Sequence, residues 1–417
     1  MCKEFIVIGI PDDKRFVHGE QIRQLLQENC QFSGGKRHHE LMKPYLPHGY
    51  IWIDITVPLE DVFVQYEKME GTIVVFASGD PLFFGYANTL QRQMPDAKIT
   101  VYPYFNSLQM LAHRLLMPYH DMHIVSLTGR PWHAFDEALI RGWGKIGVLT
   151  DSVHTPAAIA QRMLDYGYDR YVMSVGEHLG NPDHERITTL SLEKATKRDF
   201  ARPNCVVLQS ENHPSHPLSP ISHPTTTFPL PDHLFELLDG REKMITKAPI
   251  RLLTLASLEL RNRQTFWDIG FCTGSVSIEA KLMFPHLHVT AFEIREEGRR
   301  LMDVNSHRFH APGIETVMGD FLQLDVSGYP QPDAVFIGGH GGHLPEMVQK
   351  TVRCLSEGGI LVYNCVLPSS VTDARIRTDN RERFIHAAKA CGLLLEEPLH
   401  VAINDYHPID ILKARKP

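Results

Sequence analysis

The sequence predicts an α/β protein of two domains, the second of them a Rossmann-like, doubly wound sheet with an antiparallel edge. At 417 residues the chain is longer than one hydrophobic core usually serves. Apolar runs of strand length alternate with stretches of helical periodicity in both halves, as in βαβ units. A proline-rich stretch, 211–232, interrupts this alternation. We therefore expect domains at 1–212 and 232–417, joined by a linker at 213–231.

The first domain is predicted to alternate strands and helices. Apolar runs predict strands at 4–10, 50–55, 72–78, 98–104, 123–127, 145–150, 171–179 and 204–210. Helical spacing predicts helices at 19–28, 59–69, 83–93, 107–116 and 155–167. The segment SGGKRHHE, 33–40, is predicted to be a loop. This alternation favours a largely parallel sheet that binds ligands at the carboxyl ends of its strands.

Polar residues follow three of these strands: Ser78-Gly79-Asp80, Asn106-Ser107 and Thr128-Gly129-Arg130. Asp80 is suited to accept hydrogen bonds from a ligand, but an Asp-Pro turn that caps the next helix explains it equally well. Asn106 by itself fits a helix N-cap better than a ligand contact. Arg130 places a guanidinium where a carboxylate substrate can be bound by two hydrogen bonds, and a solvated surface turn is the alternative.

The predicted linker carries His213, His216 and His223 among several prolines. A metal-binding tract is one interpretation, but no carboxylate or thiol cluster accompanies these histidines. We favour a solvated, extended spacer and predict no metal site.

The second domain is predicted to follow the same alternation. Strands are expected at 265–270, 288–293, 314–320, 333–339 and 358–366, with a final pair near 393–403 and 409–415. Helices are expected at 244–260, 275–284, 295–309, 344–355 and 379–392. Five α/β units followed by a strand pair predict the doubly wound sheet and its antiparallel edge.

The stretch TFWDIGFCTGS, 265–275, is typical of a strand, a tight turn and a helix start. Its glycines allow positive φ and a close approach of a ligand to the backbone, and the N–H groups at the helix start favour a polar or anionic group. Glu293 ends the next strand, where an acidic residue usually binds the two hydroxyls of a ribose. Because the loop is spaced G-x-x-x-G and not G-x-G-x-x-G, we predict a nucleoside site for S-adenosylmethionine (SAM). A strand–helix turn without a ligand is the alternative.

The cofactor contacts predicted in this half are Thr246, Asp268, Gly270, Cys272, Thr273, Gly274, Ser275, Glu293, Gly319, Asp320 and Gly338, with Gly319-Asp320 facing an adenine amine. We interpret Cys272 as a small packing residue, and a reactive thiol is the alternative. The loop GGHGGH, 338–343, is interpreted as an edge of the substrate pocket that offers His340 or His343 for acid–base or carboxylate contacts. A metal site in that loop is the less favoured interpretation.

Composition narrows the functional classes. With 43% hydrophobic and 22% charged residues the chain has an ordinary globular composition. A net charge of −7 without a basic run argues against a nucleic-acid partner. No apolar stretch is long enough for a membrane span, and the short apolar N-terminal run predicts a strand and not a secretion signal. The seven scattered cysteines predict no disulfide framework and a cytoplasmic protein.

The first half resembles the CbiE-type tetrapyrrole methylases of corrin (cobalamin) biosynthesis. The similar segments are SGGKRHHEL, FASGDPLFFG, YPYFNSLQMLAHRL, VSLTGR, VLTDSVHTPAAIA and GEHLGNPDHERI. The resemblance implies a tetrapyrrole methylase fold with SAM contacts at Gly9, Ser78, Gly79, Asp80, Asn106, Ser107 and Thr128. The chain departs from that family after its first strand, where Gly9-Ile10-Pro11-Asp12-Asp13-Lys14 stands in place of G-x-G-P-G.

The second half resembles the CbiT-type corrin methyltransferases, which have the class I SAM-dependent methyltransferase fold. The similar segments are LPDHLF, ITKAPIR, FWDIGFCTGSVSIEA, AFEI, PQPDAVFIGGHGGHLPE and GGILVYNCV. Cys272 stands where the family's loop, D-I-G-x-G-T-G-S, has its middle glycine. The two halves together imply SAM-dependent methylation of a precorrin at ring carbons 5 and 15, with loss of carbon dioxide from the ring C acetate. By analogy, the first half would methylate carbon 5 and the second would methylate carbon 15 and decarboxylate.

The chemistry suits such a chain, because methyl transfer from a sulfonium needs aligned reactants and no strong side-chain nucleophile. A substrate with many carboxylates gives a role as orienting cations to Arg37, Arg130, Lys247 and Arg251. One alternative is a SAM-binding protein in which only the C-terminal half is active. Another is a methyltransferase for a non-corrin substrate such as ribosomal RNA or a translation factor. The resemblance also implies a homo-oligomer.

Overall fold

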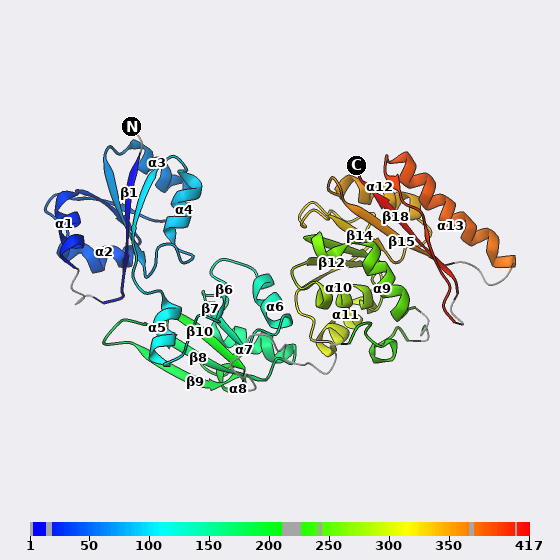
Figure 1. Cartoon of the computed structure of the whole chain (residues 1–417), viewed down its shortest axis with the longest axis horizontal. Helices are drawn as coiled ribbons and strands as arrows, with labels where there is room; N and C mark the ends of the chain where they lie inside the picture. Colours follow the sequence, from blue (N-terminus) through cyan, green and yellow to red (C-terminus); the bar gives the residue numbers. More distant parts are fainter. Residues whose placement is uncertain are drawn as a thin grey trace. The chain divides into compact units, whose positions relative to one another are not determined.

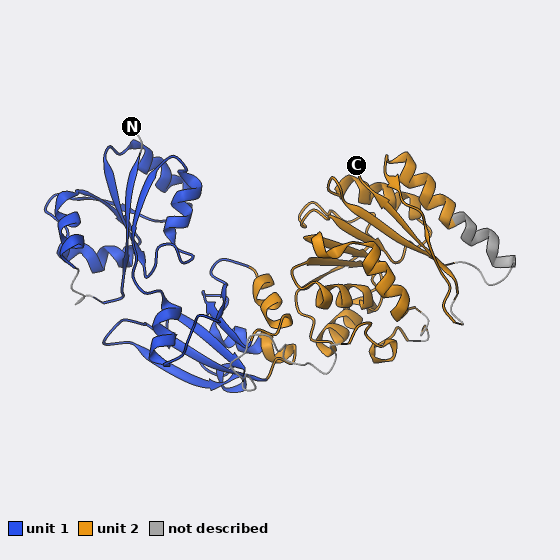
Figure 2. Ribbon diagram, viewed as in Figure 1, with its two compact units in different colours: residues 1–130, 144–161, 170–217 blue, residues 131–143, 162–169, 218–417 orange. Residues whose placement is uncertain are grey.

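The computed structural model describes residues 3–13, 19–210, 227–239, 241, 244–366, 371–404 and 407–417. Contacts divide the chain into two compact units (Figure 2). Unit 1 comprises Met1–Arg130, Gly144–Gln161 and Arg170–Pro217, and unit 2 comprises Pro131–Trp143, Arg162–Asp169 and Leu218–Pro417. The linker histidines His213, His216 and His223 lie outside the described residues. The domain boundaries therefore stay a prediction.

Unit 1 begins with a parallel five-stranded sheet of order β3-β2-β4-β1-β5 (Figure 1). Its elements are β1 (Glu4–Ile10), α1 (Glu20–Glu28), β2 (Gln31–Gly34), α2 (Lys36–Met42), η1 (Lys43–Tyr45), β3 (Ile51–Asp54), α3 (Glu60–Lys68), β4 (Thr72–Ser78), α4 (Tyr86–Gln93) and β5 (Lys98–Tyr102). Apolar side chains of α1 and α2 pack on one face of the sheet, and those of α3 and α4 pack on the other. The segment 33–40, predicted to be a loop, is instead the end of β2 and most of α2.

The second sheet has the order β6-β7-β10-β8-β9. The elements of this part of the chain are α5 (Ser107–Arg114), β6 (His123–Ser126), α6 (His133–Ile140), β7 (Lys145–Leu149), α7 (Pro156–Asp165), β8 (Tyr171–Glu177), β9 (Arg186–Ser191), α8 (Leu192–Ala195) and β10 (Asn204–Ser210). Only β6 and β7 pair in parallel, and the other pairs are antiparallel. The prediction of a largely parallel sheet is therefore right for the first sheet and wrong for the second, because periodicity does not encode strand direction.

Unit 2 contains a sheet in which β13-β12-β11-β14-β15 run parallel and β18 pairs antiparallel with β15, β16 and β17. Its elements from the linker onward are η2 (Asp232–Leu234), α9 (Ala248–Ser257), η3 (Leu260–Asn262), β11 (Thr265–Ile269), α10 (Ser275–Met283), β12 (His288–Glu293), α11 (Glu297–Arg308), β13 (Ile314–Met318), β14 (Ala334–Ile337), α12 (Leu344–Cys354), β15 (Ile360–Val366), α13 (Val371–Ala390), β16 (Leu394–Leu395), β17 (Leu399–Val401) and β18 (Ile409–Arg415). Helices α12 and α13 cover one face, while α9 and α10 cover the other. The predicted doubly wound sheet with an antiparallel edge is confirmed.

Two properties of the described residues bear on function. Each helix there is too short or too polar to cross a bilayer. The same residues hold no group of three or more His, Cys, Asp or Glu side chains arranged for a metal ion.

Candidate functional site

Unit 1 has a cavity of about 220 Å³ at the carboxyl ends of β1 and β4. Its lining brings together most of the residues predicted as ligand contacts in this half: Arg37, Ser78, Gly79, Asp80, Asn106 and Ser107. Thr128 and Arg130, predicted to contribute as well, are not part of the lining.

Gly9 and Gly79 let the strand ends approach closely behind this cavity. A Cβ atom on Gly9 would lie 1.9 Å from the carbonyl oxygen of Gly79, which accepts a hydrogen bond from the Tyr104 N–H at 3.2 Å. Gly79 has φ of +62°, which a side chain would strain. Gly9 therefore acts through backbone packing, and a larger residue there would displace the strand end that borders the cavity.

Asp80 and Asn106 also have local structural roles. Asp80 Oδ1 accepts a hydrogen bond from the Leu82 N–H at 2.9 Å, within a turn, but it does not cap a helix as the alternative interpretation predicted, because α4 begins at Tyr86 with Gly85 as its N-cap. Asn106 is the N-cap of α5, as predicted, and accepts from the Gln109 N–H at 2.8 Å. These bonds do not remove either residue from the cavity wall, so their role as ligand contacts stays a prediction.

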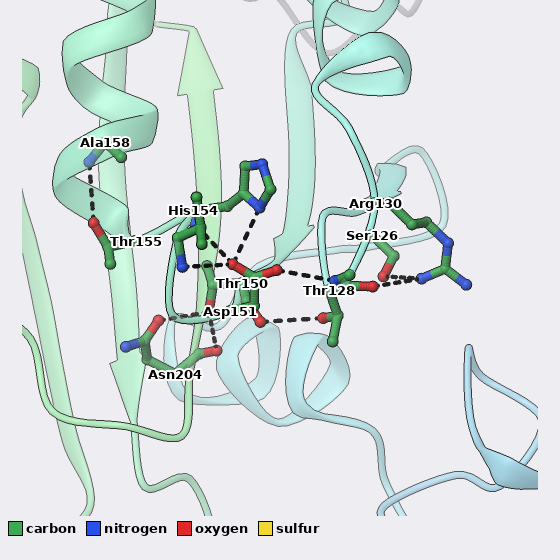
Figure 3. Close-up of polar contacts among 11 residues, drawn as sticks. Ser126, Thr128, Arg130, Thr150, Asp151, His154, Thr155, Ala158 and Asn204 are labelled. Carbon is green, nitrogen blue, oxygen red and sulfur yellow. Dashed lines mark hydrogen bonds and ion pairs between the residues drawn. The ribbon is translucent and has the colours of Figure 1, made fainter. Parts of the chain in front are cut away.

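A second polar group lies at the carboxyl ends of β6 and β7 (Figure 3). Asp151 accepts hydrogen bonds from the backbone N–H groups of Gly129, Val153 and His154. These hydrogen bonds, of which the one from the His154 N–H has the largest effect, lower the pKa of Asp151 well below its usual range. Asp151 thus joins the loops after the two strands, a role that the sequence analysis missed although its place after an apolar run resembles that of Asp80.

Arg130 extends from the same loops. Its Nη1 donates to Ser126 Oγ at 2.8 Å (Figure 3). Its guanidinium lies 5.3 Å from the ring centre of Phe84. The Thr128 hydroxyl donates to the Thr150 carbonyl at 3.1 Å (Figure 3). Arg130 remains exposed and suited to a carboxylate, whereas the hydroxyl of Thr128 serves the loop.

In unit 2 the loop between β11 and α10 has three residues with positive φ: Gly270, Cys272 and Gly274. A Cβ atom on Gly270 would lie 2.6 Å from the backbone nitrogen of Gly339, in the loop that follows β14. Parallel strands β11 and β14 are neighbours in the sheet, so the two glycine loops meet at its carboxyl edge. This is the edge at which doubly wound sheets bind ligands.

Two buried polar atoms lie at this edge, Asp268 Oδ1 near the end of β11 and Thr273 Oγ1 in the loop, and the described residues offer neither a hydrogen-bond partner. Buried polar atoms are ordinarily paired, so these two are suited to a bound ligand. Burial raises the pKa of Asp268 to about 7, and the charge of Glu293 contributes further. With the close glycine approach, this arrangement fits a nucleoside cofactor with polar substituents.

Glu293 connects the end of β12 to the same loop. Only 2% of the residue is exposed, and its Oε2 accepts from the Cys272 N–H at 2.9 Å. Oε1 accepts from the N–H groups of Ile294 and Arg295. Each carboxylate oxygen has two lone pairs, so Oε2 retains acceptor capacity for a ribose hydroxyl.

Cys272 has φ of +52°, a backbone conformation that favours glycine. Its thiol donates to the Met244 carbonyl at 3.3 Å. Burial raises the pKa of this thiol, and a thiol held protonated is a poor nucleophile. These observations favour the packing interpretation over the reactive one.

His340 lies three residues beyond β14 and faces Tyr363, with His340 Nε2 3.4 Å from the phenolic oxygen. Its Nδ1 accepts from the Gly342 N–H at 3.1 Å, so a neutral His340 carries its proton on Nε2. Burial lowers the pKa of His340. Tyr363 was not identified from the sequence, because a tyrosine inside an apolar strand run resembles a core residue.

Arg251 corrects the sequence analysis. It was predicted to orient substrate carboxylates, but it is fully buried. Its Nε pairs with Glu279 at 2.5 Å and its Nη1 with Asp232 at 3.1 Å. Arg251 lies on the buried face of α9, together with apolar residues of that helix. Arg251 therefore stabilises the fold and does not orient the substrate. Lys247, the N-cap of the same helix, is half-buried.

The remaining predicted contacts are placed as follows. Gly319 and Asp320 follow β13, Gly338 follows β14, Ser275 begins α10, and Thr246 precedes α9. The Gly319 N–H donates to the Glu293 carbonyl, and Asp320 Oδ1 accepts from the Leu322 N–H at 2.9 Å. The Thr246 carbonyl accepts from Arg251. Gly319 and Gly338 thus border the edge that carries the loop of β11, and cofactor contact by this group stays a prediction.

Comparison with known proteins gives consistent matches over most of the chain. Residues 13–196 match the family of tetrapyrrole (corrin/porphyrin) methylases, and residues 238–379 match the precorrin methyltransferase domain. The precorrin-6Y C(5,15)-methyltransferase (decarboxylating) of Sinorhizobium sp is 32% identical over 362 residues, which are 86% of this chain and 84% of that protein. The protein of the same name from Mycobacterium tuberculosis is 29% identical over 369 residues, 88% of either chain. The cobalt-precorrin-6B C(15)-methyltransferase (decarboxylating) of Salmonella typhimurium is 40% identical over 143 residues, 34% of this chain and 72% of that protein.

Proposed function

The chain belongs to the precorrin-6Y C(5,15)-methyltransferase (decarboxylating) family, and we infer from this premise that it methylates a precorrin and removes carbon dioxide from it in cobalamin biosynthesis. We propose SAM as the methyl donor, because the polar edge of each unit suits such a cofactor. A non-corrin substrate receives no support from these relatives.

We propose that each unit has its own methyl-transfer site. The observation that carries this proposal is that glycine-lined strand ends occur twice, at the cavity of unit 1 and around Gly270 of unit 2. When bound, SAM supplies an electrophilic methyl group. The residues of the chain bind and orient the reactants, because proximity and alignment account for much of the rate of such a transfer.

In unit 2, Glu293 is proposed to hold the ribose hydroxyls, while Asp268 and Thr273 contact polar substituents of the cofactor. His340 lies in the loop that follows β14, and its Nε2 is 3.4 Å from the hydroxyl of Tyr363. A proton donor is useful there, because an acetate side chain that loses carbon dioxide must gain one proton to become a methyl group. In unit 1, Ser78, Asp80 and Asn106 are proposed to line the cofactor site, with Arg37 and Arg130 orienting substrate carboxylates.

We assign methylation of carbon 5 to unit 1, and methylation of carbon 15 with decarboxylation to unit 2. The Salmonella relative, named for the C(15) methylation and decarboxylation alone, matches about a third of this chain. This name supports the assignment of those two steps to one part of the chain. The homo-oligomer remains a prediction from the sequence.

Calorimetry of SAM binding to the full-length chain tests the proposal. We expect two equivalents per chain, and turnover that transfers two methyl groups and releases one molecule of carbon dioxide per precorrin. One equivalent, with carbon 15 methylated and carbon 5 unmodified, would favour the alternative in which only the C-terminal half is active. No binding would contradict the proposal.

A further inference from the structure

The strongest unexplained feature is the position of Asp12, in the segment that departs from the G-x-G-P-G pattern of related proteins. Asp12 lines the cavity of unit 1 beside Arg37 and Ser78. Its Oδ1 lies 3.1 Å from Arg37 Nη1, and only 14% of the Asp12 side chain is exposed. Its other oxygen faces Asn181 Nδ2 at 3.5 Å and His178 Nδ1 at 3.7 Å. A carboxylate of the protein thus forms an ion pair with the guanidinium of Arg37 at the wall of the cavity.

Arg37 presents a second donor to the same region. Its Nη2 donates to Ser78 Oγ at 2.7 Å, so one guanidinium joins Asp12 and Ser78. A guanidinium binds carboxylates most strongly when two of its N–H groups engage both oxygens. Asp12 pairs with Nη1 of Arg37 and not with Nη2, and the ion pair is partly exposed to solvent. Such a pair is weak enough to be exchanged for a better one.

His38 determines the direction of the Ser78 hydroxyl. His38 Nδ1 accepts from the Gly35 N–H at 3.2 Å, and Nε2 lies 2.9 Å from Ser78 Oγ. Burial lowers the pKa of His38 to about 4, so the ring is neutral and its one proton is on Nε2. Ser78 Oγ therefore accepts from both His38 and Arg37, and its own hydrogen is left to donate. Among the described residues no acceptor faces this hydrogen, and Ser78 lines the cavity.

We propose that Arg37 and Ser78 form a carboxylate-binding subsite in the cavity of unit 1, and that Asp12 is an internal carboxylate that a ligand carboxylate displaces. The proposal rests on the proposed function, because both the precorrin and the methionine part of SAM carry carboxylates. Asp12 then acts as a selectivity device. A ligand occupies the subsite only if its ion pair with Arg37 is stronger than that of Asp12, which disfavours uncharged ligands.

Binding measurements on the full-length chain test this. The probes are uroporphyrin, a tetrapyrrole polycarboxylate, followed by absorbance, and S-adenosylhomocysteine, followed by calorimetry. We expect Asp12→Asn to tighten one or both probes roughly two- to tenfold, because it removes the competing charge without changing shape. Arg37→Gln and Ser78→Ala should weaken the same probe. An effect on uroporphyrin identifies a substrate carboxylate, and an effect on S-adenosylhomocysteine identifies that of the cofactor.

Two comparisons exclude a general effect of charge. Glu20→Gln removes one negative charge from an exposed ion pair with Arg23 on α1, and it should change neither affinity measurably. In an Arg37→Gln background, Asp12→Asn should have a smaller effect, since Asp12 then no longer competes with the ligand for the guanidinium.

Unchanged or weakened binding of both probes in Asp12→Asn would overturn the inference, as would an equal effect without Arg37. The proposed function would survive either result if the wild type still methylated its precorrin. The two ideas therefore fail separately.

Discussion

At the scale of single residues, burial decides whether a charged side chain serves the site or the fold. Arg251 and Arg37 were both predicted to orient substrate carboxylates. Arg251 is fully buried against Glu279, whereas 41% of the Arg37 side chain is exposed and it borders the cavity. Their sequence contexts did not distinguish the two.

Arg251→Met should lower the free energy of unfolding by about 3–5 kcal/mol, because it leaves Glu279 buried without its cation. Urea denaturation of the full-length chain measures this. Adding Glu279→Leu should recover much of the loss, since removing both charges is often nearly neutral. If Arg251→Met instead kept wild-type stability but bound the precorrin more weakly, the result would support the original prediction that Arg251 orients substrate carboxylates.

Asp268 should make the free energy of unfolding fall as the pH rises, which is the reverse of the usual effect of a carboxyl group. Burial raises its folded-state pKa to about 7, above the ordinary value of 3.8 for an aspartate. The folded state then binds this proton more tightly than the unfolded state, so the contribution is complete below about pH 4 and is lost as the pH rises through about 7.

Asp268→Asn should therefore reduce the fall in unfolding free energy between about pH 4 and 7, as measured by urea denaturation at each pH. The exposed Asp61→Asn is the control and should leave the profile unchanged. A difference between wild type and Asp268→Asn that stays constant across this range would contradict the interpretation.

At the scale of secondary-structure elements, the ends of neighbouring strands create the sites. In unit 2 the loops after β11 and β14 approach through Gly270 and Gly339, and β12 adds Glu293. In unit 1 the ends of β1 and β4 approach through Gly9 and Gly79. Both edges depend on glycine because backbone occupies the space that a Cβ would need.

Gly270→Ala should disrupt this approach and reduce SAM binding at unit 2. Gly358→Ala is a matched control, because Gly358 also has positive φ but an added Cβ would meet nothing within 4 Å. Both variants bear a backbone cost of about 1 kcal/mol, and Gly270→Ala should lose a further ~1–3 kcal/mol through overpacking. Denaturation and SAM calorimetry measure the two effects, and equal losses would show that the contact with Gly339 is unimportant.

At the scale of the whole molecule, the two units present separate sites on one chain. Unit 1 has two sheets and unit 2 has one, and each unit has its own glycine-lined edge and its own acidic residue at a strand end. Changes at sites that share no contact partners usually act independently. We therefore expect lesions in one unit to leave the chemistry of the other intact.

Glu293→Gln should weaken SAM binding at unit 2 roughly 10- to 100-fold, abolishing methylation of carbon 15 and release of carbon dioxide while carbon 5 is still methylated. Asp80→Asn is the reciprocal variant and should affect carbon 5 alone. Mass spectrometry of the products, with a carbon dioxide assay, distinguishes these outcomes. Loss of both methylations in either variant would mean that the sites are coupled.

Much of the fold followed from the sequence alone. Periodicity placed most of the described helices and strands, and the positive-φ loop at Gly270–Gly274 followed from its small residues. These features are local, because hydrogen bonding within a helix, pleat alternation and glycine's freedom depend on near neighbours. The resemblance of both halves to corrin methyltransferases rests on the same local motifs.

Tertiary structure alone decided which distant residues meet. The antiparallel second sheet, the burial of Arg251, and the pairing of Asp12 with Arg37 all depend on segments far apart in the chain. A single sequence records the polarity of each residue but not the partner that satisfies it. The same arginine is a structural cation where packing excludes water, and a candidate ligand-binding group where a cavity remains.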